Sequence, residues 1–260
     1  MALNRSVPVP LYYQLAELIR EQIAAGELRP GDQVPGERTL SEQYQISRMT
    51  ARQALVYLER EGTLVSEQGR GTFVAAPKLT YDALHLLGFT EAMLLRGAKP
   101  RARVLEQGVV TPPLRVARDL GLAGGEEAVK IVRLRFSDVT PLLLETSYIP
   151  LSRCPGLAQD DLASQSLYTL LEQRYGVRLL RATQTLEATV ANAYEQQLFG
   201  VAEGMPMILL TGVTFDDHNK PVEQFKAIYR GDRFKLTYES ERGAPVGNQV
   251  PAPRLSMVLA

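Results

Sequence analysis

The sequence predicts an α+β fold in two parts. Within residues 1–76, three segments with helical spacing of apolar residues precede two β-rich runs around a glycine turn, which is the plan of a winged helix-turn-helix. Beyond a short linker, strand-like runs alternate with short helices at hairpin-like spacing, which favours an antiparallel sheet. We expect a winged helix-turn-helix over 1–76, a linker over 77–84, an α+β domain over 85–238 and an irregular tail over 239–260.

The three predicted helices each have a recognisable start or stop. The first follows Pro10, ends at Gly26 and has an apolar face of Leu11, Leu15, Leu18, Ile19 and Ile23. The second covers about 37–44. The third runs from the N-cap Ser47 to about residue 61, where Gly62 ends it, and its core stripe is Ala51, Ala54, Leu55 and Leu58. Residues 63–67 and 72–74 form the hairpin.

Arginines fall on the parts of this plan that face DNA. Arg48, Thr50 and Arg52 lie in the first turns of the third helix, where a recognition helix contacts base edges. Arg38 opens the second helix and suits a phosphate. Arg70 lies at the hairpin tip between two residues that allow close backbone approach, Gly69 and Gly71. Each arginine alone could be a solvated cap or turn residue; their joint placement favours double-stranded DNA as a partner.

Bulk charge does not indicate nucleic acid. The chain has net charge zero, and residues 1–76 carry eight arginines, no lysine and nine acidic residues, a net charge of −1. The prediction of DNA binding therefore depends on the positions of the arginines.

The composition excludes several classes of protein. The chain has 260 residues, of which 45% are hydrophobic, and no apolar run approaches the ~18 residues that span a membrane. The start lacks the apolar stretch of a secretory signal, and the single Cys154 cannot form an internal disulfide, so we expect a cytoplasmic protein without membrane contact. Two histidines and one cysteine argue against a zinc or iron–sulfur site, and we expect no metal and no cofactor.

The sequence of the larger domain predicts six strands and four helices. We place strands near 101–110, 127–136, 141–149, 177–190, 206–215 and 221–230. We place helices near 80–96, 113–121, 166–175 and 191–199.

The N-terminal part resembles the GntR family of bacterial transcription regulators. The matching stretches are 11–15 (LYYQL), 26–32 (GELRPGD), 35–41 (PGERTLS), 47–55 (SRMTARQAL), 62–65 (GTLV) and 69–74 (GRGTFV). Gly36 stands where the family usually has serine, so the second helix lacks a side-chain cap, at a cost of only a few tenths of a kcal/mol.

The C-terminal part resembles the UTRA effector domain of the HutC subfamily. The matching stretches are 89–93 (FTEAM), 96–97 (RG), 132–135 (VRLR), 145–150 (ETSYIP), 166–168 (SLY), 221–223 (PVE) and 229–233 (YRGDR). The resemblance implies a chorismate-lyase-like fold and a small-molecule effector. It is strongest to regulators of amino-sugar use, which respond to phosphorylated glucosamine derivatives, and it includes Phe89 and Tyr168 among the candidate effector residues.

Strand alternation independently places polar side chains on one sheet face. If residues 137–140 form a hairpin loop, Arg133 lies opposite Glu145, and Arg133, Arg135, Glu145 and Ser147 share a face. Val132, Leu134, Phe136, Leu142 and Leu144 then share the core face. Glu223 and Tyr229 share a face on the last strand.

This polar face suits a sugar phosphate. Arginine forks bind phosphate oxygens, carboxylates accept from sugar hydroxyls, and Thr90, Ser164 and Ser166 add hydroxyl groups. Ser166 also opens a helix, where free N–H groups favour an anion. The alternative is a solvated face with cross-strand salt bridges.

Three other functions remain to be weighed. Glu145 and Glu223 could form a glycosidase-like carboxylate pair, and the resemblance to the chorismate-lyase fold could indicate a lyase. Nothing marks a nucleophile or an adjacent base, however, and an enzyme needs no helix-turn-helix. A fused pyridoxal-phosphate aminotransferase-like domain, known in the wider family, needs more than the roughly 180 residues that follow the linker. An architectural DNA-binding protein would not need the polar face.

We therefore expect a transcription regulator, not an enzyme. A homodimer should read an inverted repeat, because one winged helix contacts few base pairs. An anionic effector should lower operator affinity through the segment from Ala75 to Leu84, which leads to Phe89 and Thr90.

Overall fold

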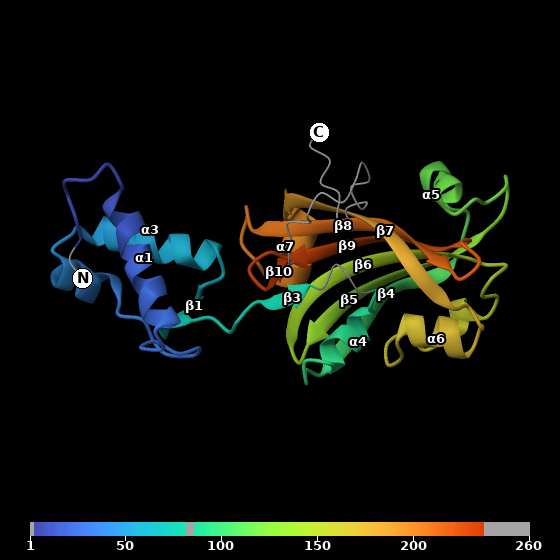
Figure 1. Cartoon of the computed structure of the whole chain (residues 1–260), viewed down its shortest axis with the longest axis horizontal. Helices are drawn as coiled ribbons and strands as arrows, with labels where there is room; N and C mark the ends of the chain where they lie inside the picture. Colours follow the sequence, from blue (N-terminus) through green and yellow to red (C-terminus); the bar gives the residue numbers. More distant parts are fainter. Residues whose placement is uncertain (1–2, 82–85, 237–260) are drawn as a thin grey trace, which may run out of the picture.

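The computed structural model describes residues 3–81 and 86–236 (Figure 1). The expected irregular tail over 239–260 lies outside the described residues. Within them, a small helical body and a larger sheet body are joined by the segment that leads into β3 (Leu79–Tyr81). No helix in these ranges is long and apolar enough to cross a membrane.

The N-terminal body has the expected winged helix-turn-helix. Its elements are α1 (Leu11–Ala24), α2 (Glu37–Tyr44), α3 (Arg48–Arg60), β1 (Leu64–Glu67) and β2 (Gly71–Val74). The antiparallel strands β1 and β2 form the wing, and Leu15, Ile19, Leu40, Ala51, Leu55 and Leu58 form the centre of a shared core.

Local capping explains where α2 and α3 meet. Gln45 adopts a left-handed conformation, φ 51°, which ends α2 one turn before α3 begins. Ser47 then accepts a hydrogen bond from the backbone N–H of Thr50 at 3.0 Å, as expected for an N-cap. Gly36 precedes α2 without a side-chain cap, which confirms the consequence expected of a glycine there.

The larger body is built on a six-stranded antiparallel sheet in the order β4-β5-β6-β9-β8-β7. The strands are β4 (Pro100–Val110), β5 (Ala128–Ser137), β6 (Thr140–Pro150), β7 (Leu179–Val190), β8 (Pro206–Asp216) and β9 (Pro221–Arg230). All six expected strands are confirmed within about two residues at either end.

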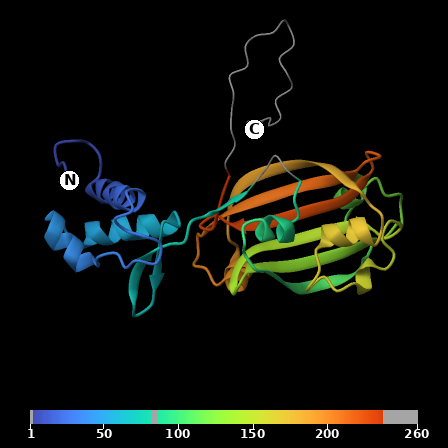
Figure 2. The same cartoon turned by 60° about the horizontal axis from the view of Figure 1, so that its bottom comes forward.

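Helices cover the sheet on both faces. On one face, α6 (Leu167–Gln173) and the 3-10 turn η1 (Leu157–Gln159) pack on Ile131, Ile149 and Val222, and α4 (Phe89–Leu94) packs on Leu143 and Phe225 (Figure 2). On the other, α7 (Ala193–Phe199) packs through Phe199 near Leu134, Leu144 and Ile228. A further helix, α5 (Leu114–Asp119), follows β4.

The expected helix over 80–96 is wrong at its start. Residues 79–81 form β3, which pairs in parallel with β10 (Phe234–Leu236), and the helix covers only Phe89–Leu94. A strand partner from the far end of the domain outweighs the local helical pattern, and local pattern cannot reveal such a partner. Part of the expected linker is therefore a strand of the larger body.

The core face assigned to Leu142 is also wrong. The register between β5 and β6 shifts between Arg135 and Phe136, so Leu142 lies in a bulge. It packs with Leu143 and Phe225 on the α4 side, whereas Leu134 and Leu144 pack on the α7 side as expected. A bulge adds one residue and so reverses the alternation beyond it.

A direct contact joins the two bodies. Gly62 (φ +73°) follows α3 and lies against the larger body. A Cβ at this position would lie 2.7 Å from the Cα of Asp232. Lys78 Nζ donates to the carbonyl oxygen of Gly231 at 2.8 Å, and Leu79 N–H donates to that of Arg233 at 2.7 Å. The turn after β9 therefore lies against the C-terminal end of the recognition helix.

Gly62→Ala should destabilise the protein more than Gly26→Ala. Both glycines have positive φ, so alanine costs about 1 kcal/mol of backbone strain at each. Only Gly62 also meets backbone atoms, since nothing lies within 4 Å of a Cβ at Gly26. Denaturant unfolding measures both losses. Equal losses at the two positions would contradict the contact between the bodies.

Candidate DNA-binding surface and effector pocket

The recognition helix α3 divides into a buried and an exposed side. Ala51, Ala54, Leu55 and Leu58 are buried, as their spacing predicted. Arg48, Arg52 and Gln53 are exposed, and Met49 is 62% exposed although it is apolar. Thr50 is half-buried, and its hydroxyl lies 2.8 Å from that of the cap Ser47. The outward side is therefore free to enter a groove.

Three of the predicted DNA-contacting arginines have acidic neighbours. Arg52 lies 3.9 Å from Glu37, Arg38 lies 3.7 Å from Glu42, and Arg70 pairs with Glu67. All three guanidinium groups are well exposed, so these pairs contribute little energy and salt screens them. A DNA phosphate can therefore replace the carboxylate beside each of these arginines at little cost in free energy.

The wing tip has the backbone geometry that its glycines predicted. Gly69 and Gly71 have φ of +75° and +123°, which side-chain-bearing residues rarely adopt. Gln33 Nε2 donates to the carbonyl oxygen of Arg70 at 3.0 Å and so ties the tip to the segment before α2.

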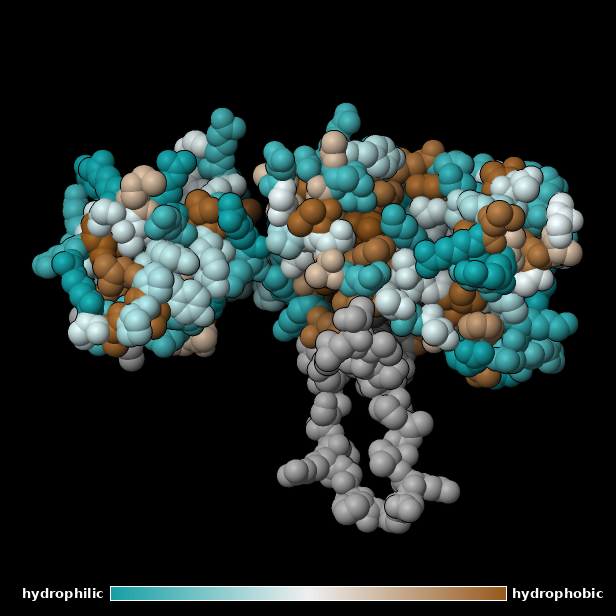
Figure 3. All heavy atoms as spheres, turned by 90° about the horizontal axis from the view of Figure 1, so that it is seen from above, coloured by the Kyte–Doolittle hydropathy of each residue, from teal (hydrophilic) through white to brown (hydrophobic). Residues whose placement is uncertain are grey.

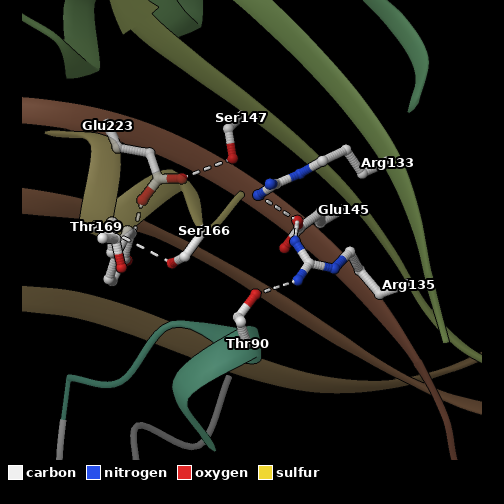
Figure 4. A network of polar contacts seen from close by, with 9 residues as sticks. Thr90, Arg133, Arg135, Glu145, Ser147, Ser166, Thr169 and Glu223 are labelled. Carbon is white, nitrogen blue, oxygen red and sulfur yellow. Dashed lines mark hydrogen bonds and ion pairs between the residues drawn. The ribbon is translucent and has the colours of Figure 1, made fainter. Parts of the chain in front are cut away.

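An open cavity of about 610 Å³, including the part in contact with solvent, lies between the sheet and the helices α4 and α6. Its lining combines polar groups on the sheet with Phe89 and Thr90 of α4 and Ser166 and Tyr168 at the start of α6. Figure 4 shows the polar side chains from the sheet and the two helices pointing toward one another.

Glu145 sits between the two buried arginines, Arg133 and Arg135. Arg133 lies directly opposite Glu145 in the β5–β6 register, which confirms the expected pairing. The Glu145 carboxylate lies 2.5 Å from Arg133 and 3.1 Å from Arg135. Burial would raise the pKa of Glu145, but the two guanidinium groups hold it below its ordinary value. Glu145 is therefore ionised and shared by both cations.

The two arginines keep unused hydrogen-bonding capacity. Among the described residues, Nε and Nη1 of Arg133 and Nε of Arg135 are buried without a partner. Arg135 also donates to Thr90 at 2.6 Å and lies 4.7 Å from the ring centre of Phe89, which holds its plane. Buried donors without partners cost free energy, so an anion that accepts from them binds favourably.

Glu223 occupies a different environment a short way along the same face. It accepts hydrogen bonds from Ser147 at 2.6 Å, Tyr168 at 3.1 Å and Thr214 at 3.1 Å. Burial raises the pKa of Glu223 and also raises that of Tyr168 well above its ordinary value. The pocket thus pairs a cationic end with an end rich in hydroxyl and carboxyl groups.

Nine of the ten predicted effector residues line the cavity, namely Phe89, Thr90, Arg133, Arg135, Glu145, Ser166, Tyr168, Glu223 and Tyr229. Ser164 does not, because its hydroxyl contacts the carboxylate of Asp161 in an exposed turn. Sequence reasoning missed Gln184, Leu210, Phe225 and Ala227. Alternation from Glu223 signals Phe225 and Ala227, whereas Gln184 needs the β7–β8 register.

Three comparisons with known proteins bear on the chain. The model of the "Bacterial regulatory proteins, gntR family" matches residues 11–74, and that of the "UTRA domain" matches 95–235, more than half of the chain. The HTH-type transcriptional repressor NagR of Bacillus subtilis is 36% identical over 93% of this chain and 99% of its own length.

The chain belongs to the GntR family of transcription regulators and carries a UTRA domain.

Two further comparisons support this assignment. The probable fructoselysine utilization operon transcriptional repressor of Escherichia coli is 30% identical over 89% of this chain and 95% of its own. The crystal structure of PhnF from Mycobacterium smegmatis is 31% identical, covers 87% of this chain and 99% of its own, and superposes with a TM-score of 0.61. These proteins are regulators, which confirms the expectation that the chain is not an enzyme.

Regulators of this family bind operator DNA with the N-terminal domain and effectors with the UTRA domain. Within residues 3–81 and 86–236, no cluster of three or more His, Cys, Asp or Glu side chains is placed to hold a metal ion. Cys154 is fully buried, and burial raises the pKa of its thiol to about 12.

The raised pKa of Glu223 should make the stability of the UTRA domain pH-dependent. The folded state binds this proton more tightly than the unfolded chain, whose glutamates titrate near 4.5. The stabilisation from this proton is complete at pH values below about 4.5. It is lost as pH rises through the pKa that Glu223 has in the folded protein.

Glu223→Gln removes this titration. The free energy of unfolding of the wild type, minus that of the variant, should therefore fall as pH rises above about 4.5. Denaturant unfolding at a series of pH values measures the difference, with Glu203→Gln, an exposed glutamate before β8, as a control that leaves the profile unchanged. A difference that rises with pH would mean that Glu223 is stabilised as a carboxylate.

Proposed function

We propose that the chain is a homodimeric repressor of operator DNA that an anionic effector releases. The proposed effector is a phosphorylated sugar of the glucosamine 6-phosphate type, bound in the cavity of the UTRA domain. The observation that carries the proposal is the pair Arg133 and Arg135, whose unpartnered donors line a cavity with two carboxyl groups.

The two ends of the cavity suit the two ends of a sugar phosphate. The phosphate accepts from the free nitrogens of Arg133 and Arg135, with Thr90 and Ser166 close by. The sugar hydroxyls or amine donate to Glu223, which has only neutral hydroxyl partners among the described residues.

The names of the relatives support the direction of control. NagR and the probable fructoselysine utilization operon regulator are both named transcriptional repressors. We extend this direction of control to this chain. A repressor acts where its operator lies, so we place the protein in the cytoplasm.

The contacts between the two bodies support a route for the response. Tyr229 lines the cavity and stacks edge-on against Phe234 of β10, with ring centres 4.8 Å apart. Between them, Arg230 makes a two-pronged ion pair with Asp232, whose backbone lies against Gly62 after the recognition helix. An effector that moves Tyr229 therefore moves the support of the DNA-binding domain. The segment 82–85, part of the expected lever, lies outside the described residues.

Base-contacting and phosphate-contacting arginines should differ in their effect on DNA binding. Arg48→Ala or Arg52→Ala should weaken binding to the operator by about 1–3 kcal/mol and relax discrimination between sequences. Arg38→Ala should weaken binding to all duplexes and lower the salt slope by about one unit. Fluorescence titration at several salt concentrations separates the two effects, and identical behaviour would contradict the assigned roles.

Arg133→Ala should abolish the response to glucosamine 6-phosphate without changing operator affinity in its absence. The substitution removes two of the three buried unpartnered donors of the pair Arg133 and Arg135, while Glu145 keeps Arg135 as a counter-ion. The matched control is Arg103→Ala, an exposed arginine on β4 of the same sheet. A variant that still releases operator at the wild-type effector concentration would show that the anion binds elsewhere.

A further inference from the structure

The charges inside the effector cavity have to be balanced by groups within it. Hydrophilic residues spread over the faces of both bodies that Figure 3 shows, where water solvates them. The charged groups of the cavity lie deeper, since Glu223 is only 3% exposed and Glu145 is shared by the buried Arg133 and Arg135. A buried charge without a counter-charge is costly, so charge balance restricts what the cavity binds.

The two carboxyl groups of the cavity differ in their ability to hold a proton. Glu145 lies between guanidinium groups, which are donors only, so it stays a carboxylate. Glu223 instead contacts the hydroxyl groups of Ser147, Tyr168 and Thr214. A hydroxyl group can donate or accept, so these three partners suit a carboxylate and a carboxylic acid equally.

Two of these hydroxyl groups share one oxygen of Glu223. The hydroxyls of Tyr168 and Thr214 each lie 3.1 Å from Oε2 of Glu223, and they lie 3.3 Å from each other, where either can be the donor. When a proton binds to Glu223, Tyr168 can accept that hydrogen and turn its own toward Thr214. Protonation of Glu223 therefore leaves the heavy atoms around it in place.

Among the described residues, the titratable side chains of the lining are Arg133, Arg135, Glu145, Tyr168, Glu223 and Tyr229. Arginine and tyrosine side chains keep their protons at neutral pH, and the arginines hold the pKa of Glu145 below its ordinary value. Burial raises the pKa of Glu223. The other polar groups near it from β6, β7 and β8, on Ser147, Gln184 and Thr214, do not titrate. Glu223 is therefore the group in this lining whose charge can change.

A bound sugar phosphate leaves the cavity short of one positive charge. The two arginines and ionised Glu145 have a net charge of +1, whereas a phosphate monoester brings a charge of about −2. If Glu223 is ionised as well, the buried total is about −2. A positive charge can come from an ammonium group on the sugar or from a proton on Glu223.

The spacing along β6 directs one side of the sugar ring toward Glu223. Glu145, which contacts the arginines, and Ser147, which donates to Glu223, lie on one face of β6 about 7 Å apart. In a hexose 6-phosphate, C2 lies across the ring from C5, which carries the phosphate-bearing carbon. A phosphate on the arginines therefore turns the C2 side of the ring toward Glu223.

We propose that Glu223 binds the C2 nitrogen of the effector and exchanges one positive charge with it. Glucosamine 6-phosphate binds with its ammonium group against ionised Glu223. The N-acetyl form binds with Glu223 protonated, so that the acid donates to the acetyl oxygen. The inference rests on the sugar phosphate of the proposed function and names the group that distinguishes its two nitrogen forms. The cavity accepts both forms, and pH sets their relative affinity.

Calorimetric titration of the full-length protein with glucosamine 6-phosphate and with N-acetylglucosamine 6-phosphate tests this exchange. Buffers of different ionisation heat give the number of protons taken up, at pH values of about 5.5 to 7, where a free amino group is charged. The N-acetyl ligand should take up as much as one proton more than the amine. Its affinity should therefore fall relative to that of the amine, by up to about tenfold per pH unit. Ionisation of the phosphate is common to both ligands and cancels in the ratio.

Glu223→Gln supplies a neutral group of the same shape that cannot titrate. It should weaken binding of glucosamine 6-phosphate roughly tenfold or more, because a charge-assisted hydrogen bond is lost. It should largely retain N-acetylglucosamine 6-phosphate, which also shows that the variant is folded, and it should make the affinity ratio independent of pH. The matched control is Glu203→Gln, an exposed glutamate before β8, which keeps the wild-type affinities and pH dependence.

The outcomes separate this inference from the proposed function. An affinity ratio that changes with pH in the wild type and not in Glu223→Gln supports the proposal. Equal proton uptake with both ligands, binding of one ligand only, or a pH-dependent ratio that survives in Glu223→Gln overturns it and leaves the sugar phosphate effector in place. Absence of binding by either ligand overturns the proposed effector and this inference together.

Discussion

The sharing of one carboxylate by two buried arginines is the constraint on which the effector domain depends. Arg133 and Arg135 are each only 3% exposed, and Glu145 neutralises them without meeting all their hydrogen-bonding capacity. Cations so deeply buried are costly unless they are paired, and three donors remain unused. The sheet therefore holds a preformed anion site, kept in shape by Thr90 and Phe89 of α4.

The same sheet face connects this site to the DNA-binding domain. Tyr229 reaches from the cavity to Phe234, and the turn between them is fixed by the buried pair Arg230 and Asp232. That turn contacts Gly62 directly after the recognition helix. The described residues therefore form a continuous series of packed contacts between the two bodies. The proposed effector would favour a second conformation of these residues.

Much of the fold and of the candidate site could be predicted from the sequence, because the patterns that decide them are local. Alternation on two strands joined by a short loop gave the Arg133–Glu145 pairing, and capping residues gave the helix-turn-helix. Several of the wrong or missed predictions have non-local causes. The pairing of β3 with β10 joins distant segments, the bulge at Leu142 reverses one alternation, and Gln184 reaches the cavity through a register between β7 and β8. Ser164 was misplaced because a turn to Asp161 satisfies its hydroxyl.

The central claim is that the cavity and the operator-binding surface share one conformational equilibrium. Calorimetric titration of the full-length protein with glucosamine 6-phosphate, in the presence and absence of saturating operator duplex, tests it most directly. Linkage requires operator DNA to weaken effector binding by the same factor, about 5–150-fold, by which the effector weakens operator binding. Equal effector affinity with and without operator DNA would contradict the account.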